Sequence, residues 1–75
     1  MSISDVMIHI NESLSTEARS SLENAIQNVE GVVSPRFNAG KAHLLMITYD
    51  TGKTNAAALL EKTRAVGYTA QLVGM

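Results

Sequence analysis

The chain has 75 residues, a length typical of one domain that buries only about 60% of the surface its unfolded form exposes. Its 45% hydrophobic and 17% charged residues indicate a globular protein. Its net charge of −1, six Lys and Arg against seven Asp and Glu, argues against nucleic acid or an anionic membrane as partner. The absence of cysteine excludes disulfides, thiolate metal sites and thiol catalysis.

The first predicted element is a strand over residues 5–10, because apolar and other residues alternate there with a period of two. Three residues of one parity are predicted to face the core: Val6, Ile8 and Ile10. Met7 and His9 then point to the opposite side of the sheet.

A helix follows, since apolar residues recur at helical spacing along one stripe. The stripe consists of Ala18, Leu22, Ala25, Ile26 and Val29. Ser15 is the predicted N-cap, because its hydroxyl can accept a hydrogen bond from a free amide of the first turn. Glu17 suits the positive end of the helix, and Gly31 is predicted to close the helix in a left-handed conformation.

Residues 32–37 form the second predicted strand. Pro35 cannot donate a hydrogen bond to a neighbouring strand, which predicts that this strand lies at an edge of the sheet. Residues 38–41, with sequence NAGK, are the predicted hairpin turn, in which Gly40 can take a positive φ. The third and most apolar strand then covers residues 42–50.

A second turn, DTGK, covers residues 50–53 and leads to a helix over residues 55–66 with Thr54 as its predicted cap. Gly67 ends this helix, and residues 68–73 form the last strand. The helix side chains predicted to face inward are Ala56, Leu59, Leu60 and Thr63.

The predicted order is βαββαβ over a single domain, residues 1–75. Right-handed crossovers then put the first and third strands at the centre of one antiparallel sheet, with both helices on one face. We therefore expect an α+β protein, a ferredoxin-like sandwich. This fold supports many functions and decides none of them.

No apolar run is long enough to cross a bilayer, and the first ten residues do not have the pattern of a secretory signal. We therefore expect a cytoplasmic location. We also expect no enzymatic activity and no cofactor, because the sequence offers no set of residues suited to catalysis. Glu12 and Glu17 flank one loop, but so small a domain has no room for a deep cleft that would raise their pKa values.

The side of the sheet that faces away from the helices, the open face, is predicted to carry an apolar patch of Met7, His9, Leu44 and Met46, with Val73 beside it. Three interpretations remain open: ordinary surface apolarity, a protein-contact face, and a soft-metal site of Met7, His9 and Met46. His43 has the opposite parity to Met46. It is therefore predicted to be a solvated residue that does not join His9.

Three sequence segments resemble the heavy-metal-associated domain family of metal carriers. They are VEGV at residues 29–32, NAGKAHLLMITYD at residues 38–50 and AVGYTAQLV at residues 65–73. In order and spacing they are similar to the family's signatures. The resemblance covers nearly the whole chain and implies the same βαββαβ fold.

The family's metal motif, Gly-Met-x-Cys-x-x-Cys, lies in the loop that enters the first helix. Counting back from Gly31, the glycine position falls on Ser13, the methionine on Leu14 and the two cysteines on Thr16 and Arg19. A neutral hydroxyl and a permanent cation replace the two thiolates that suit a soft ion. The resemblance therefore implies a degenerate loop, Ser13 to Arg19, without the family's metal site. Its hydroxyls, the helix start and Arg19 could instead hold an anion, although helix capping alone explains the same residues.

The sequence therefore predicts a small binding or adaptor module related to heavy-metal-associated domains. It would contact a protein partner, or a second copy of itself, through the open face (Met7, His9, Leu44, Met46) or the degenerate loop (Ser13, Leu14, Ser15, Thr16, Arg19). Two alternatives stay open: a metal-binding or metal-transport protein with a Met and His site, and a small-molecule sensor domain, because such sensors share this topology.

Overall fold

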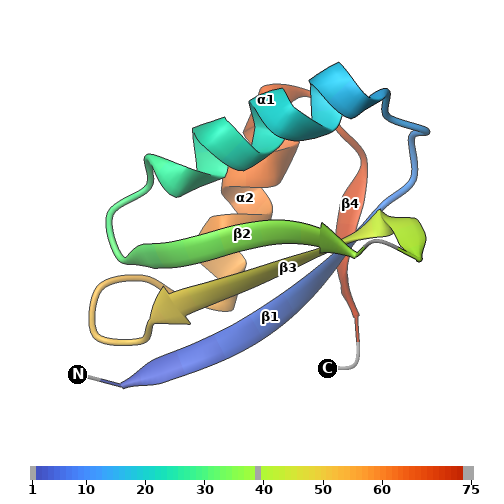
Figure 1. Cartoon of the computed structure of the whole chain (residues 1–75). Coiled ribbons are helices and arrows are strands. Elements are labelled where there is room, and N and C mark those ends of the chain that lie inside the picture. The colour runs from blue at the N-terminus through green and yellow to red at the C-terminus, as the bar shows by residue number, and fades with distance from the viewer. Residues whose placement is uncertain (1, 39, 74–75) are drawn as a thin grey trace.

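The structure is a computed structural model that describes residues 2–38 and 40–73. Its elements in chain order are β1 (Ile3–Ile10), α1 (Thr16–Gln27), β2 (Val32–Asn38), β3 (Lys41–Asp50), α2 (Ala56–Val66) and β4 (Ala70–Val73) (Figure 1). The predicted order βαββαβ is confirmed. β1 starts two residues earlier than expected, and β4 starts two residues later.

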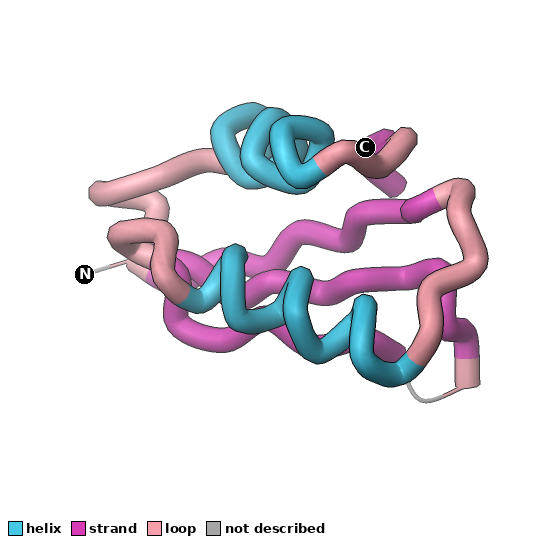
Figure 2. Tube along the Cα trace, turned by 90° about the horizontal axis from the view of Figure 1, so that it is seen from above, coloured by secondary structure: helices cyan, strands magenta, loops and turns pink. Residues whose placement is uncertain are grey.

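The four strands form one antiparallel sheet in the order β2-β3-β1-β4. β1 and β3 are central, as predicted, and Pro35 lies on an edge strand, where its missing N–H costs no ladder hydrogen bond. α1 contacts β2, α2 contacts β4, and the two helices touch each other above the sheet (Figure 2). One face of the sheet is therefore covered by helices, and the other is open.

The core lies between the sheet and the helices. It consists of Val6, Ile8, Ile10, Leu22, Ile26, Leu45, Ile47, Tyr49, Leu59 and Ala70. Strand alternation predicted Val6, Ile8 and Ile10 of this set, and helical spacing predicted Leu22, Ile26 and Leu59. Thr63 is fully buried on α2, and its hydroxyl donates to the Leu59 carbonyl at 3.0 Å, so its burial leaves no unpaired polar atom.

The helix starts are capped by side chains. Ser15 caps α1 as predicted, since its hydroxyl accepts from the Ala18 amide at 3.1 Å. The prediction of Thr54 as the second cap is wrong: Asn55 caps α2, and its Oδ1 accepts from the Ala58 amide at 2.8 Å. Both residue types cap well, and the backbone of Asn55, extended at φ −150° and ψ 170°, decides between them.

Glycines close two turns. Gly67 ends α2 at φ 118°, as predicted. α1 ends earlier than expected, at Gln27, so Gly31 (φ 93°) forms the turn into β2 and not the helix end. A Cβ at Gly31 would lie 2.7 Å from the Cβ of Lys53, so a larger residue would also collide there.

The hairpin between β2 and β3 is irregular. Phe37 pairs with Leu45 but Asn38 pairs with Lys41, so β3 has extra residues that no β2 residue faces. Gly40 donates its amide to Asn38 Oδ1 at 2.9 Å. Ala39, also in the predicted turn, lies outside the described residues.

Candidate functional site

The open face carries an apolar row across the sheet. Met46 lies opposite Met7, which in turn lies opposite Val73 on β4. Met46 is 40% exposed, while Met7 and Val73 are half-buried. Arg36 on the edge strand continues the row beyond Met46 and gives it a charged end. The row thus brings together one side chain from each of the four strands.

Leu44 and His9 form the next row. They lie opposite each other, and Gln71 on β4 faces His9 from the other side. Of the residues in the Met and His metal hypothesis, Met7 and Met46 are therefore direct neighbours, while His9 belongs to the row beside them. The register brings Met7, His9, Leu44 and Met46 onto one surface.

Polar side chains border the apolar row on the side away from His9. The Thr48 hydroxyl donates to Asp5 Oδ1 at 3.0 Å, and Arg36 Nε donates to the Ser34 hydroxyl at 3.3 Å. These hydrogen bonds hold the polar groups in place, and the polar groups lie between the methionines and the far end of the sheet.

His43 corrects the sequence prediction. Its ring stacks beside that of His9, with centroids 5.7 Å apart and planes inclined by 17°. The alternation argument failed because the regular β1–β3 ladder ends at the pair His9 and Leu44, and the β2–β3 register shifts in the same part of β3. An irregularity of this kind re-aims side chains relative to the regular pleat.

Arg19 forms hydrogen bonds within the degenerate loop. Arg19 donates from Nη1 to the Leu14 carbonyl and from Nη2 to the Thr16 hydroxyl, both at 3.3 Å. Thr16 and Arg19, which the count along the sequence predicts to stand at the family's cysteine positions, thus contact each other. The guanidinium puts a permanent positive charge where a metal carrier would need two anionic sulfur ligands, and this donor set does not fit a soft metal ion.

The anion interpretation of the same loop finds no support. The Ser15 hydroxyl is used by the helix cap, and Arg19 is hydrogen-bonded within the loop. Ser13 and Thr16 are exposed. These contacts are those expected of a capped helix with a self-contained entry loop.

Glu12, the residue before this loop, is bound to Thr69, the residue before β4. Its two carboxylate oxygens accept from the Thr69 amide at 2.9 and 3.1 Å. The hydrogen bond from the Thr69 backbone is the main reason why the pKa of the Glu12 carboxyl lies below its ordinary value. Glu12 therefore works as a carboxylate that fastens two loops and not as a proton donor.

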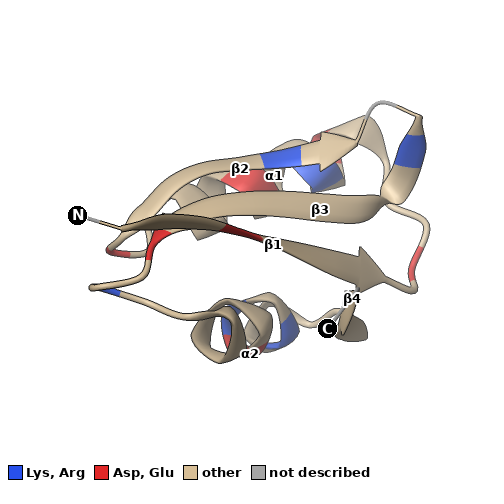
Figure 3. Ribbon diagram, turned by 90° about the horizontal axis from the view of Figure 1, so that it is seen from below, with Lys and Arg blue, Asp and Glu red and all other residues tan. Residues whose placement is uncertain are grey.

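Charges are scattered over the molecule (Figure 3). Neither the basic nor the acidic residues of the described chain gather into one patch, and the only ion pair among them is Arg64 with Glu61, at 3.3 Å. This distribution lacks the basic surface by which proteins meet nucleic acid. Among the described residues, no helix has the length and apolarity needed to cross a membrane.

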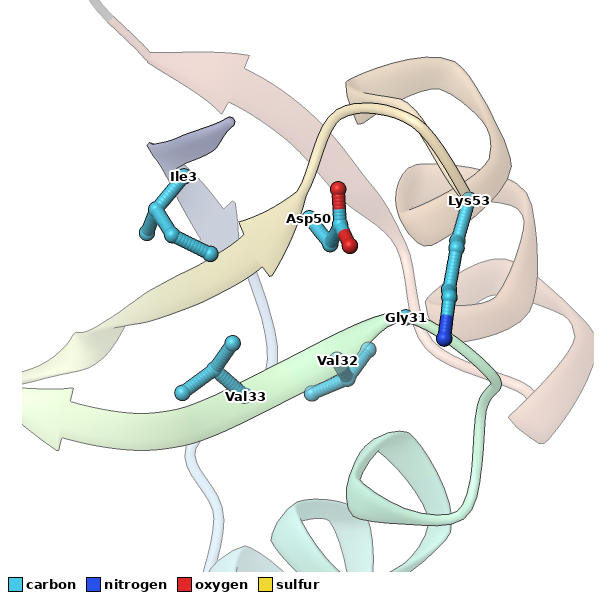
Figure 4. Close-up of a pocket in the computed structure, with 6 residues that line it drawn as sticks. All are labelled: Ile3, Gly31, Val32, Val33, Asp50 and Lys53. Atoms are coloured by element: carbon cyan, nitrogen blue, oxygen red, sulfur yellow. The ribbon is translucent and has the colours of Figure 1, made fainter. Parts of the chain in front are cut away.

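A shallow pocket lies at the far end of the sheet, between Ile3, Val32, Val33, Asp50, Lys53 and Gly31 (Figure 4). Its volume of about 200 Å³ is below the roughly 300–1,000 Å³ of sites that enclose small molecules. One Asp50 carboxylate oxygen already accepts from the Gly52 amide at 2.9 Å. The pocket gives the sensor hypothesis no specific support.

No family model and no curated protein matches the sequence. Solved structures do match its fold. Oxidized MerP from Ralstonia metallidurans CH34 superposes with a TM-score of 0.83 at 21% identity, over 96% of this chain and 99% of that one. A copper-binding domain of HMA7, a P-type ATPase, gives a TM-score of 0.84 at 16% identity, over 93% of both chains.

The N-terminal domain of a potential copper-translocating P-type ATPase from Bacillus subtilis, solved in its Cu(I)-loaded state, gives a TM-score of 0.82 at 17% identity, over 95% of this chain and 88% of that one. The fold is that of the heavy-metal-associated domain. The resemblance seen in the sequence is therefore confirmed in three dimensions, for a chain that contains no cysteine. Shared fold at this identity does not carry the metal function with it.

Proposed function

We propose that this protein is a non-enzymatic binding module of the cytoplasm that contacts a protein partner, or a second copy of itself, through the open face. It has lost the metal site of the heavy-metal-associated fold. The observation that carries the proposal is the row of Met46, Met7 and Val73 across a sheet surface that no helix covers.

Methionine suits such a surface, because its unbranched side chain adapts to the shape of a partner. A contiguous apolar patch at the centre of a sheet is also larger than the isolated apolar residues that every surface carries. Arg36 at one end of the row and the Thr48–Asp5 pair at its border supply the polar rim that protein interfaces have.

Loss of metal transfer supports the same proposal. Thr16 and Arg19 offer no thiolate, and the guanidinium of Arg19 repels a cation at the loop. If the loop no longer exchanges metal, retention of the fold needs another reason. Contact through the face opposite the helices supplies one.

Met46→Asp tests the face directly. Because Met46 is 40% exposed, the variant should fold like the wild type while a charge within the row disrupts any contact made there. Sedimentation velocity over a concentration series measures self-association. Site-specific photo-crosslinking from position 44 in the source cells measures contact with a different protein. We expect Met46→Asp to abolish whichever contact the wild type makes.

Val66→Asp is the matched control, because Val66 is 45% exposed but lies on α2, away from the open face. It should leave the contact unchanged. If Met46→Asp and Val66→Asp associate as the wild type does, or if both lose association equally, the open face is not the contact surface.

A further inference from the structure

The two histidines of this chain meet at one end of the sheet. His9 is near the end of β1 and His43 near the start of β3, and their rings stack with centroids 5.7 Å apart. Both side chains are half-buried. They lie on the sheet at the end where the loop Asn11–Ser15 leaves β1, but their ligand atoms are not those of the family's loop motif.

Hydrogen bonds fix which ring nitrogen of His43 is free. Nδ1 of His43 lies 2.7 Å from the Ile10 carbonyl oxygen, which can only accept, so Nδ1 carries the proton. Nε2 of the neutral ring then has a free lone pair. A histidine that donates its Nδ1–H to a carbonyl is the arrangement by which proteins orient imidazole ligands toward metal ions.

His9 has a similar partner. Its Nδ1 lies 3.2 Å from Asn11 Oδ1, an acceptor, which again favours the proton on Nδ1 and the lone pair on Nε2. The side-chain amide of Gln71 also reaches His9 Nδ1, at 3.4 Å, and turning this amide by half a rotation presents its oxygen instead. Both rings are thus supported at Nδ1 by neighbouring residues.

The spacing of the rings suits a shared ion. Imidazole nitrogen binds zinc at about 2.0–2.1 Å, so two rings on one ion have centroids roughly 5–6 Å apart, depending on the angle at the metal. The observed 5.7 Å falls in this range. Binding of one ion by both rings requires that the two Nε2 atoms turn toward one point.

We propose that His9 and His43 form a chelating site for a borderline divalent transition-metal ion, of the class of Zn²⁺, Ni²⁺ and Cu²⁺, bound through both Nε2 atoms. Imidazole is a good ligand for these ions, whereas Cu(I) and Hg(II) favour sulfur. This site goes beyond the proposed contact function and does not depend on it.

The site is an open one. The described residues contain no group of three or more His, Cys, Asp or Glu side chains that could surround an ion. Two protein ligands leave further coordination positions for water or for a donor group from a binding partner, which distinguishes this site from a closed structural zinc site with four protein ligands.

Isothermal titration calorimetry with ZnCl2, together with NMR spectra of the histidine ring nitrogens, tests the proposal. We expect one equivalent of Zn²⁺ and simultaneous shifts of Nε2 in both rings. His9→Gln and His43→Gln should each raise the Kd at least tenfold, because either change removes the chelate. Should His43→Gln unfold the protein by losing its bond to Ile10, His9→Gln still gives the result.

Met46→Leu is the control, because Met46 is a nearby soft donor on the same face. It should change the Kd less than twofold. Three results would each overturn the site. The first is binding of two equivalents of Zn²⁺, of which each histidine variant loses only one while the Kd stays unchanged. The second is an unchanged Kd in both histidine variants, and the third is a tenfold rise of the Kd in Met46→Leu.

Discussion

Single residues decide what the entry loop of this fold can do. In the resemblance to heavy-metal-associated domains, Thr16 and Arg19 stand at the cysteine positions, and in the structure Arg19 donates hydrogen bonds to the Thr16 hydroxyl and the Leu14 carbonyl. The loop is thereby held by internal hydrogen bonds where a carrier would hold an ion. Glu12 adds a second tie, from the start of the same loop to Thr69.

Glu12→Gln should lower the melting temperature at neutral pH. The pKa of Glu12 is lower in the folded protein, so its carboxylate stabilises the fold above the ordinary pKa of 4.5, and this contribution disappears as the pH falls through the lower folded value. Thermal unfolding measured from pH 7 down to pH 3 should show a difference in melting temperature between the wild type and the variant. This difference should become smaller as the pH falls.

Glu30→Gln is the control for this measurement, because Glu30 is exposed and no hydrogen bond of its side chain occurs among the described residues. It should change the melting temperature little at either end of the series. If the difference in melting temperature between the wild type and Glu12→Gln stays constant down to pH 3, the carboxylate charge of Glu12 does not have this stabilising role.

At the scale of elements, the alternation and helical patterns predicted the six elements and most of the core. They succeeded because one face of each strand and one stripe of each helix must be buried, and this leaves a periodic trace in the sequence. The position of His43 could not be predicted in this way, because a register shift in β3 changes side-chain direction without any local sequence signal.

The candidate site could be predicted only in part, because strand alternation gives the face on which a side chain lies and not its neighbours on the other strands. Met7 and Met46 could be assigned to one face by parity, but their direct pairing depends on the register between β1 and β3. The closure of the loop by Arg19 depends on the rotamer of a long side chain, which no spacing rule reports. His9 was predicted on the open face, and the feature that sequence reasoning missed is its stacking on His43.

The cap of α2 gives a test at this scale. Asn55→Ala should lower the free energy of unfolding by about 1 kcal/mol, within the roughly 0.5–2 kcal/mol range for N-caps, because the Ala58 amide loses its acceptor. Thr54→Ala is the matched control, since no hydrogen bond of the Thr54 hydroxyl occurs among the described residues. If urea denaturation shows the larger loss in the free energy of unfolding for Thr54→Ala, the assignment of Asn55 as the cap is wrong.

At the scale of the whole molecule, the chain combines the fold of the heavy-metal-associated domain with a sequence that contains no cysteine. Its backbone superposes on copper-binding domains over more than nine-tenths of its length, yet the first turn of α1 offers a hydroxyl, from Thr16, and a guanidinium, from Arg19. The open face carries the methionine row, and the histidine pair lies at one end of the sheet. The two proposals concern adjacent parts of this one face and can fail separately.

We propose that the frame of the metal carriers is intact in this chain and that only the thiolate ligands are missing. The measurement that tests it most directly is Cu(I) retention against an excess of a competing monothiol, in the wild type and in the double variant Thr16→Cys, Arg19→Cys. Two thiolates held at the start of a helix bind one ion as a chelate, which a monothiol cannot match at equal affinity per sulfur. We expect the wild type to retain no Cu(I) and the double variant to retain one Cu(I). Retention of Cu(I) by the wild type, or a folded double variant that remains metal-free, would contradict it.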